Sequence, residues 1–134
     1  MKKMTSIKIL TLLFSVVLIF VCATTNFSKT SNVNMNIVVL VKYKALENKA
    51  NTAIIEMTKL INSVKKEPHF IKIKILLDPK DSTNIMLFEE WDNKEYYTGA
   101  HMQTDHLKKY ILDSRSFLAG PPEISIWHPA SEFK

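Results

Sequence analysis

Glycine and cysteine are scarce in this 134-residue chain. It has two glycines, Gly99 and Gly120, and these cannot supply the Gly-rich loops that cradle phosphates and dinucleotides. We therefore do not expect a bound nucleotide or flavin dinucleotide. The one cysteine, Cys22, lies near the start, so the rest of the chain has no disulfide, thiolate nucleophile or cysteine metal site. A Ser-centred nucleophile elbow (G-x-S-x-G) is also absent from the sequence.

The first 23 residues are typical of an export signal. Three lysines precede residue 9, residues 9–23 carry no charge, and small residues lead up to Ala23. This pattern predicts cleavage after Ala23 and a periplasmic or secreted protein. The apolar run is shorter than the roughly 20 residues of a membrane-spanning helix. An uncleaved N-terminal anchor and a lipoprotein modified at Cys22 remain as alternatives.

Removing the signal changes the charge balance of the chain. The chain has 18 basic and 13 acidic residues; three of the basic ones and none of the acidic ones precede residue 24, so 15 minus 13 leaves +2. Such a weak excess does not predict a nucleic-acid partner. Residues 24–35 are rich in Ser, Thr and Asn and predict a flexible linker. The prediction is then one domain over residues 36–129 and a tail over 130–134.

Four segments of the domain have the composition of β-strands. They cover residues 36–43, 70–77, 84–91 and 123–128, and they are rich in Ile, Val and aromatic residues. The first and third carry apolar residues on both faces, which indicates strands covered on both sides. The second alternates Ile with Lys and therefore has one apolar face.

Helical spacing marks two further segments. Apolar residues recur at three- and four-residue intervals over 47–66, and Pro68 ends that helix. A second helical region begins near Lys94 and is predicted to be broken: Gly99 lies in its first part, and Thr104 is a suitable N-cap for its second part. Gly120 and two prolines end it.

The predicted order is β-α-β-β-α-β, which is the ferredoxin-like α+β fold: a four-stranded antiparallel sheet with two helices on one face. The helices cover only one face of this sheet. The other face carries apolar residues as well, and these predict a homodimer with sheet facing sheet.

Two histidines in the second helical region are the strongest candidates for chemistry. His101 and His106 can exchange a proton near neutral pH. His106 falls in the first turn after Thr104, where the helix dipole favours the neutral imidazole. Met102, His106 and Tyr110 lie four residues apart and would line one side of a cavity on a continuous helix. Alternatively, one histidine is a surface residue and the other a packing residue.

A carboxylate and several aromatic residues accompany the histidines. Glu89 and Trp91 share one face of their strand, so Glu89 is either an acid with a raised pKa or half of a strand-end salt bridge, the reading we favour. Aromatic residues could supply flat walls for a ring-shaped ligand: Trp91, Phe88, Tyr43, Tyr96, Tyr97 and Tyr110. A metal site is the less favoured reading, because a spacing of five residues points the two histidines to different sides of a regular helix.

Together these motifs resemble a known family. Glu89-Glu90-Trp91, then the H-x-x-T-x-H run from His101 to His106, then Gly120-Pro121 resemble the antibiotic biosynthesis monooxygenase (ABM) domain, especially its small quinol monooxygenases. The sequences Lys66-Glu67-Pro68 and Leu77-Asp78-Pro79 are similar to pieces of the related enzyme that processes the phosphorylated autoinducer-2 signal. The resemblance covers roughly residues 36–128.

The resemblance implies a dimeric ferredoxin-like enzyme that oxidises a quinol or similar aromatic with dioxygen, without metal or flavin. It implies His106 as the base and His101 as a second hydrogen-bonding group. Substrate contacts are then expected from Trp91, Phe88, Tyr110, Tyr43, Glu89 and Met102. Other relatives degrade haem with an Asn, a Trp and a His; Asn36 fits that pattern, but Ala100 stands where the Trp would fall. Further alternatives are an isomerase using the same pocket and a non-catalytic dimeric ligand-binding or stress protein.

Overall fold

The computed structural model describes residues 36–133. The predicted signal segment and the whole predicted linker lie outside the described residues. The elements follow the predicted order: β1 (Ile37–Lys44), α2 (Ala50–Val64), β2 (Phe70–Leu77), β3 (Asn84–Trp91), α3 (Lys94–Thr98), η1 (His101–Gln103), α4 (Asp105–Asp113), η2 (Ser114–Ser116) and β4 (Glu123–Trp127). The observed ends of the strands and of α2 differ from the predicted ones by three residues or fewer, whereas the second helical region, predicted to continue to the Gly120 stop, ends as an α-helix at Asp113 and as a 3-10 turn at Ser116.

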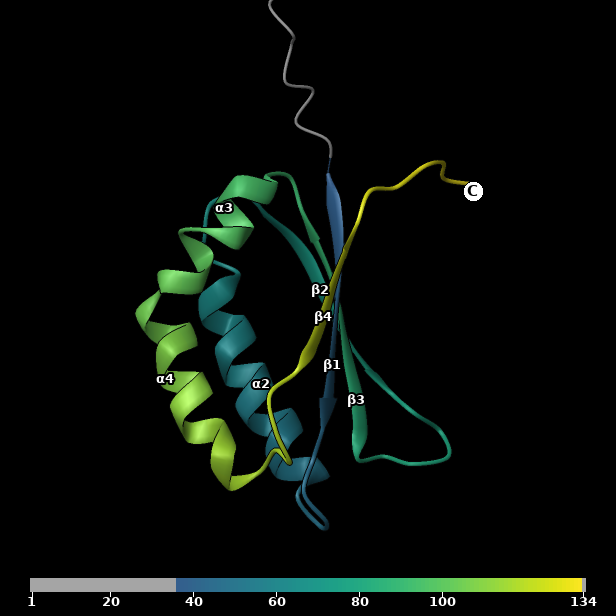
Figure 1. Cartoon of the computed structure of the whole chain (residues 1–134), viewed down its shortest axis with the longest axis vertical. Coiled ribbons are helices and arrows are strands. Elements are labelled where there is room, and N and C mark those ends of the chain that lie inside the picture. The colour runs from purple at the N-terminus through teal and green to yellow at the C-terminus, as the bar shows by residue number, and fades with distance from the viewer. Residues whose placement is uncertain (1–35, 134) are drawn as a thin grey trace, which may run out of the picture. The chain divides into compact units, whose positions relative to one another are not determined.

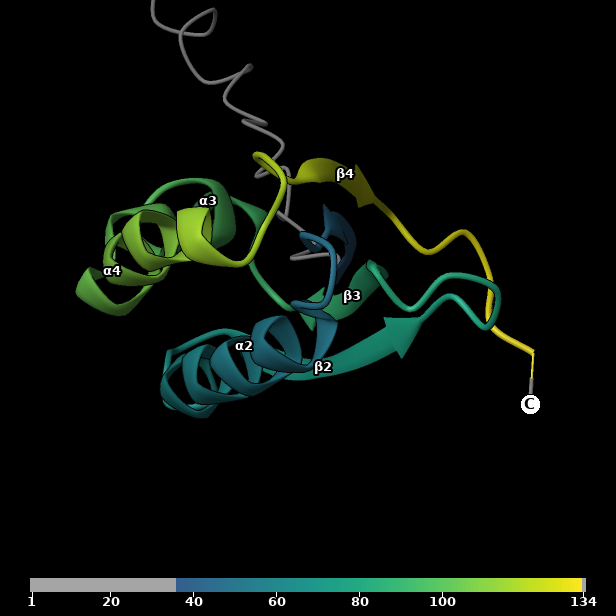
Figure 2. The same cartoon turned by 90° about the horizontal axis from the view of Figure 1, so that it is seen from below.

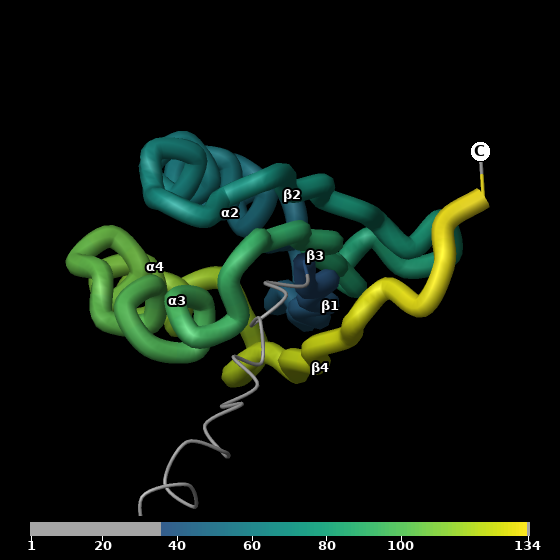
Figure 3. Tube along the Cα trace, turned by 90° about the horizontal axis from the view of Figure 1, so that it is seen from above, coloured from purple at the N-terminus to yellow at the C-terminus, as the bar shows by residue number. Residues whose placement is uncertain are grey.

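The four strands form one antiparallel sheet in the order β2-β3-β1-β4. All the helices lie on one face of this sheet (Figure 1). Helix α2 lies toward the β2 edge, and α3 and α4 lie toward the β4 edge (Figures 2 and 3). The arrangement confirms the ferredoxin-like α+β fold, because α2 covers one half of the sheet face, and α3 and α4 together cover the other half.

Strand alternation decides which side chains enter the core. The helix-facing partners across β1 and β3 are Ile37 with Trp91, Val39 with Glu89, and Val41 with Leu87, and all six are buried. Residues between them point to the opposite face, because side chains alternate along a strand. Phe88 is one of these: it lies below the side-chain ammonium groups of Lys72 and Lys74, at 5.9 and 6.0 Å from its ring centre.

Helix α2 forms because Ala53, Met57, Leu60 and Val64 make one buried stripe. A tight turn follows the helix, in which the Glu67 amide donates to the Val64 carbonyl at 2.9 Å. Pro68 prevents the helix from continuing, and His69 adopts a left-handed backbone with φ of 69°. This turn holds Glu67 just beyond the end of α2, facing the second helical region.

The second helical region is broken, as predicted, before Thr104. Gly99 ends α3, and an added Cβ there would come within 2.9 Å of the Glu95 carbonyl oxygen. Thr104 takes the N-cap position of α4, but its side chain does not cap the helix. Its hydroxyl instead donates to the carbonyl of His101 at 2.8 Å, which fixes the short η1 segment against the start of α4.

Within residues 36–133, no helix has the length and apolar character needed to span a membrane.

Candidate active site

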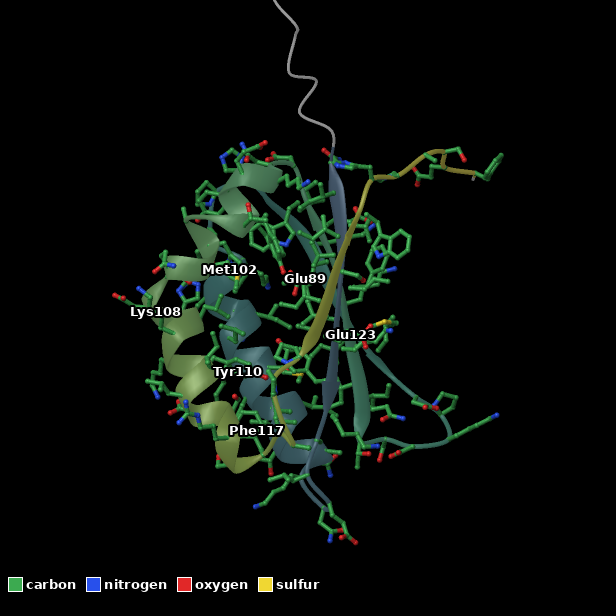
Figure 4. All side chains as sticks on the ribbon, in the orientation of Figure 1. Glu89, Met102, Lys108, Tyr110, Phe117 and Glu123 are labelled. Atoms are coloured by element: carbon green, nitrogen blue, oxygen red, sulfur yellow. The ribbon has the colours of Figure 1, made fainter. Side chains whose placement is uncertain are left out.

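A cavity of about 670 Å³ lies between the helices and the sheet. Its walls are mainly aliphatic, and they include Val41, Leu60, Ile61, Val64, Ile73 and Leu87. Figure 4 shows Glu89 extending from the sheet toward Met102 and Tyr110 on the helical side, whereas Lys108 points away from the sheet. Such a space suits a mostly apolar ligand, because few polar groups interrupt its lining.

The carboxylate of Glu67 joins the two histidines. His101 Nδ1 lies 2.8 Å from Glu67 Oε2, and His106 Nε2 lies 2.5 Å from Glu67 Oε1. The Tyr96 hydroxyl donates to Oε2 at 3.1 Å. Glu67 and His101 have side chains only 6% and 7% exposed, whereas His106 is 29% exposed. One buried carboxylate therefore connects an internal imidazole with one that reaches the solvent.

With Glu67 ionised, these hydrogen bonds set which nitrogen of each imidazole ring carries a proton. An ionised carboxylate only accepts hydrogen bonds, so His101 donates through Nδ1–H and His106 through Nε2–H. A neutral His101 then carries its lone pair on Nε2. Since His101 lines the cavity, its ring can accept a proton from a ligand while Glu67 stabilises the resulting imidazolium.

Aromatic packing fixes the orientation of His101. Its ring stacks on Tyr97, with ring centres 5.1 Å apart and 20° between planes, and lies 4.7 Å from the Trp91 ring centre. Trp91 is fully buried and also contacts Phe70 and Tyr96. Trp91 therefore supports the cavity from behind, and it does not line it.

Glu89 is the acidic side chain of the cavity lining. It is 6% exposed, and its Oε2 accepts a hydrogen bond from Trp91 Nε1 at 2.9 Å. Burial raises the pKa of Glu89 to about 7; the bond from Trp91 partly opposes this rise, and the charge of Glu67 adds to it. The favoured salt-bridge reading was wrong, because the ion pairs of the described residues do not include Glu89. The alternative reading, an acid with a raised pKa, matches the structure.

Three tyrosines also line the cavity: Tyr43, Tyr97 and Tyr110. Burial raises the pKa of each well above its ordinary value, so all three stay neutral hydrogen-bonding groups. The Tyr110 hydroxyl is buried and has no hydrogen-bond partner among the described residues.

The structure brings five of the eight predicted site residues to the cavity lining: His101, Met102, Tyr43, Tyr110 and Glu89. The other three lie elsewhere. His106 does not face the cavity as expected, because its Nε2 is turned toward Glu67. Trp91 lies behind the wall, and Phe88 is on the opposite sheet face, since odd and even residues of β3 face opposite sides.

Sequence reasoning did not assign a role to Glu67, the residue that links the two histidines. Two features of the sequence pointed to this position: Glu67-Pro68 was part of the family resemblance, and Pro68 marked the end of a helix. The sequence alone did not show that this helix end meets η1 and α4.

The haem-degrading alternative finds less support, since Asn36 and Ala100 are exposed and do not line the cavity. No set of three potential metal ligands clusters within residues 36–133.

The fold and site together define a ferredoxin-like domain with a buried acid–base cavity. The chain belongs to the antibiotic biosynthesis monooxygenase family, whose model matches residues 36–111. Membership indicates an enzyme of the monooxygenase or oxidoreductase class. No curated protein matches the sequence closely enough to count as a relative.

Solved structures share the fold at low sequence identity. A conserved protein from Methanosarcina mazei is 21% identical with a TM-score of 0.64, over 70% of this chain and 92% of that chain. A Nitrosomonas europaea protein, provisionally described as an antibiotic biosynthesis monooxygenase, is 19% identical with a TM-score of 0.66. The match covers 72% of this chain and 91% of that chain. A Bacteroides thetaiotaomicron protein of unknown function, described as a possible oxidoreductase, is 21% identical with a TM-score of 0.63. The match covers 71% of this chain and 98% of that chain.

Proposed function

We propose that this protein is an exported, cofactor-independent monooxygenase that oxidises a quinol or similar aromatic with dioxygen. The observation that carries the proposal is His101, a buried imidazole on the lining of a largely apolar cavity with Glu67 behind it. For a hydroquinone the reaction balances without another reductant: hydroquinone and dioxygen give hydroxyquinone and water. The ring supplies four electrons, one oxygen atom enters the ring, and the other leaves as water.

His101 is the base in this proposal. Its Nε2 takes the proton of the ring hydroxyl, which leaves an electron-rich anion that can pass an electron to dioxygen. Glu67 holds the ring of His101 and offsets the positive charge that develops on it. His106 acts through Glu67, because its own Nε2 is engaged by that carboxylate. This exchanges the roles that the family resemblance suggested for the two histidines.

The cavity supplies binding and protection from water. Tyr43 and Tyr110 offer aromatic surfaces, and Met102 offers an adaptable apolar contact. Enclosure between helices and sheet limits access of water to a radical pair formed from the ring anion and dioxygen. Dioxygen is then the co-substrate, and the protein works as a homodimer outside the cytoplasm.

A proton-transfer enzyme such as an isomerase is the second candidate. The observation that favours it is the presence of two proton carriers on the lining of the same cavity, His101 from η1 and Glu89 from β3. An isomerase would turn over in the absence of dioxygen, whereas the monooxygenase would not.

The test uses 1,4-dihydroxynaphthalene and ¹⁸O₂, with a reaction lacking enzyme to subtract autoxidation. We expect one ¹⁸O atom in the hydroxyquinone product. His101→Gln should lower the rate by about 100-fold or more, the usual contribution of a general base. His128→Gln is the matched control, because His128 is exposed and should leave the rate unchanged. Oxidation without ¹⁸O in the ring, or full activity in His101→Gln, would overturn the proposal.

A further inference from the structure

Glu89 is a buried acid that the proposed reaction does not use. Its Oε2 accepts from Trp91 Nε1, and its other oxygen makes no hydrogen bond to the described residues. The side chain extends from β3 toward the helical layer in Figure 4 and lines the cavity. A carboxyl group in this position has an unused polar atom that faces the ligand space.

The surroundings of Glu89 favour its neutral form. Tyr97 from α3 and Tyr43 from β1 lie within electrostatic range of it, as does Glu67, whose charge opposes ionisation of Glu89. His101 from η1 lines the same cavity, and β2 contributes the apolar Ile73. Arg115 is also on the lining, but it is not among the groups that affect the ionisation of Glu89.

A neutral carboxyl group needs an acceptor for its O–H. Trp91 Nε1 is only a donor, so it satisfies one carboxyl oxygen and leaves the acidic proton without a partner. On the lining of a largely apolar cavity, such an O–H is stabilised by an acceptor on a bound ligand. A ligand with a carbonyl oxygen would supply the acceptor, whereas an ionised Glu89 would repel that oxygen.

We infer that the protonated carboxyl of Glu89 donates a hydrogen bond to a carbonyl or quinone oxygen of an aromatic ligand, so that such ligands bind together with a proton. This rests on the proposed function only in taking a quinone as the ligand. The cavity then binds a quinone-type product tightly below neutral pH and releases it more readily above neutral pH, where Glu89 loses its proton.

The experiment measures binding, not turnover. The chain has two tryptophans, Trp91 and Trp127, so a Trp127→Phe background leaves Trp91, which contacts Glu89, as the fluorescent reporter. Binding of 1,4-naphthoquinone is followed by quenching from pH 6 to 9. Because only the protonated fraction binds, we expect the dissociation constant to be nearly constant at low pH and to rise about tenfold per pH unit well above pH 7. Naphthalene, which lacks the oxygens, should show no such rise.

Three variants separate the role of Glu89 from packing. Glu89→Gln keeps a hydrogen-bond donor but cannot ionise, so its affinity for naphthoquinone should match that of the parent at pH 6 and stay constant to pH 9. Glu89→Leu has no donor and should bind naphthoquinone up to about tenfold more weakly at pH 6, with naphthalene binding unchanged. Glu90→Gln, on the opposite sheet face, should behave as the parent.

A flat pH dependence in the parent, or an unchanged pH dependence in Glu89→Gln, would overturn the inference. The ¹⁸O experiment judges the monooxygenase independently. Proton-linked quinone binding without ring oxygenation would support the role of Glu89 and reject the proposed reaction. Ring oxygenation together with pH-independent quinone binding would support the proposed reaction and reject the role of Glu89.

Discussion

His106 Nε2 lies 2.5 Å from Oε1 of Glu67, a residue 39 positions earlier in the chain. The same carboxylate binds His101 through its other oxygen at 2.8 Å. The partly exposed histidine and the buried one are therefore connected through a single charge. Because a carboxylate has two oxygens, it can orient both imidazole rings at once, and neither ring can move without breaking a hydrogen bond to Glu67.

Replacing Glu67 tests this connection. Glu67→Gln keeps the shape of the side chain but removes the charge and one of the two acceptor oxygens. We expect the free energy of unfolding at pH 7 to fall by about 2 kcal/mol, the size typical of hydrogen bonds to a charged group, and the rate of quinol oxidation to fall with it. Urea denaturation and the ¹⁸O assay measure the two effects.

Glu90→Gln is the matched control for that experiment. Glu90 forms an ion pair with Lys72 at 2.8 Å near the surface, and such pairs contribute less than about 1 kcal/mol. Equal losses of stability in the two Glu→Gln variants would show that Glu67 has no special structural role.

Two Tyr→Phe variants should differ in their effect on stability. Tyr96→Phe removes the hydroxyl that donates to Glu67 and should cost about 1 kcal/mol. Tyr110→Phe removes a buried hydroxyl without a partner in the described chain, so the free energy of unfolding should stay constant or rise by up to about 1 kcal/mol. Thermal unfolding of the ligand-free protein checks both, and a loss in Tyr110→Phe as large as that in Tyr96→Phe would contradict this account.

The raised pKa of Glu89 makes stability depend on pH. Its pKa in the folded protein is about 7, against an ordinary value of 4.5, so ionisation favours the unfolded chain. Below about pH 4.5 Glu89 is protonated in both the folded and the unfolded chain, and its contribution to the free energy of unfolding is fully present. This contribution is lost as the pH rises to about 7. Above that, the folded protein carries a penalty on the order of 3 kcal/mol.

Glu89→Gln should remove this penalty. We expect the variant to be more stable than the parent by up to about 3 kcal/mol at pH 8, with the difference declining toward zero as the pH falls to 4.5. Denaturation curves at pH 4.5, 6 and 8 give the difference directly. A difference that does not change with pH would show that Glu89 ionises normally in the folded protein.

The proposed homodimer has its own test. Leu40 lies at the centre of the sheet face opposite the helices, paired with Phe88. We expect the domain from Asn26 onward to be a dimer in light scattering and Leu40→Lys to make it monomeric, because a dimer interface through this face would bury the new charge. Ile55→Lys, at a side chain 55% exposed on α2, should remain dimeric. A monomeric parent, or a dimeric Leu40→Lys, would reject this interface.

Local patterns predicted most of the fold. The alternation of β3 placed Glu89 and Trp91 together, and that pairing is present as a hydrogen bond of 2.9 Å. The same alternation places Phe88 on the other face, yet its aromatic character led to its assignment to the pocket. His106 was expected inside because it lies four residues from both Met102 and Tyr110, but its direction depends on the Glu67 carboxylate that it meets.

The sequence by itself determined the order of elements, the break near Gly99 and the family, because these depend on residue spacing and on backbone preferences of neighbouring residues. Only the tertiary structure decided that His101 lines the cavity, that Glu67 joins the two histidines, and that Glu89 is a buried acid without a cation. The reason is physical: the pKa and the hydrogen-bond partners of a side chain depend on groups brought close by packing, and those groups lie on other elements of the chain.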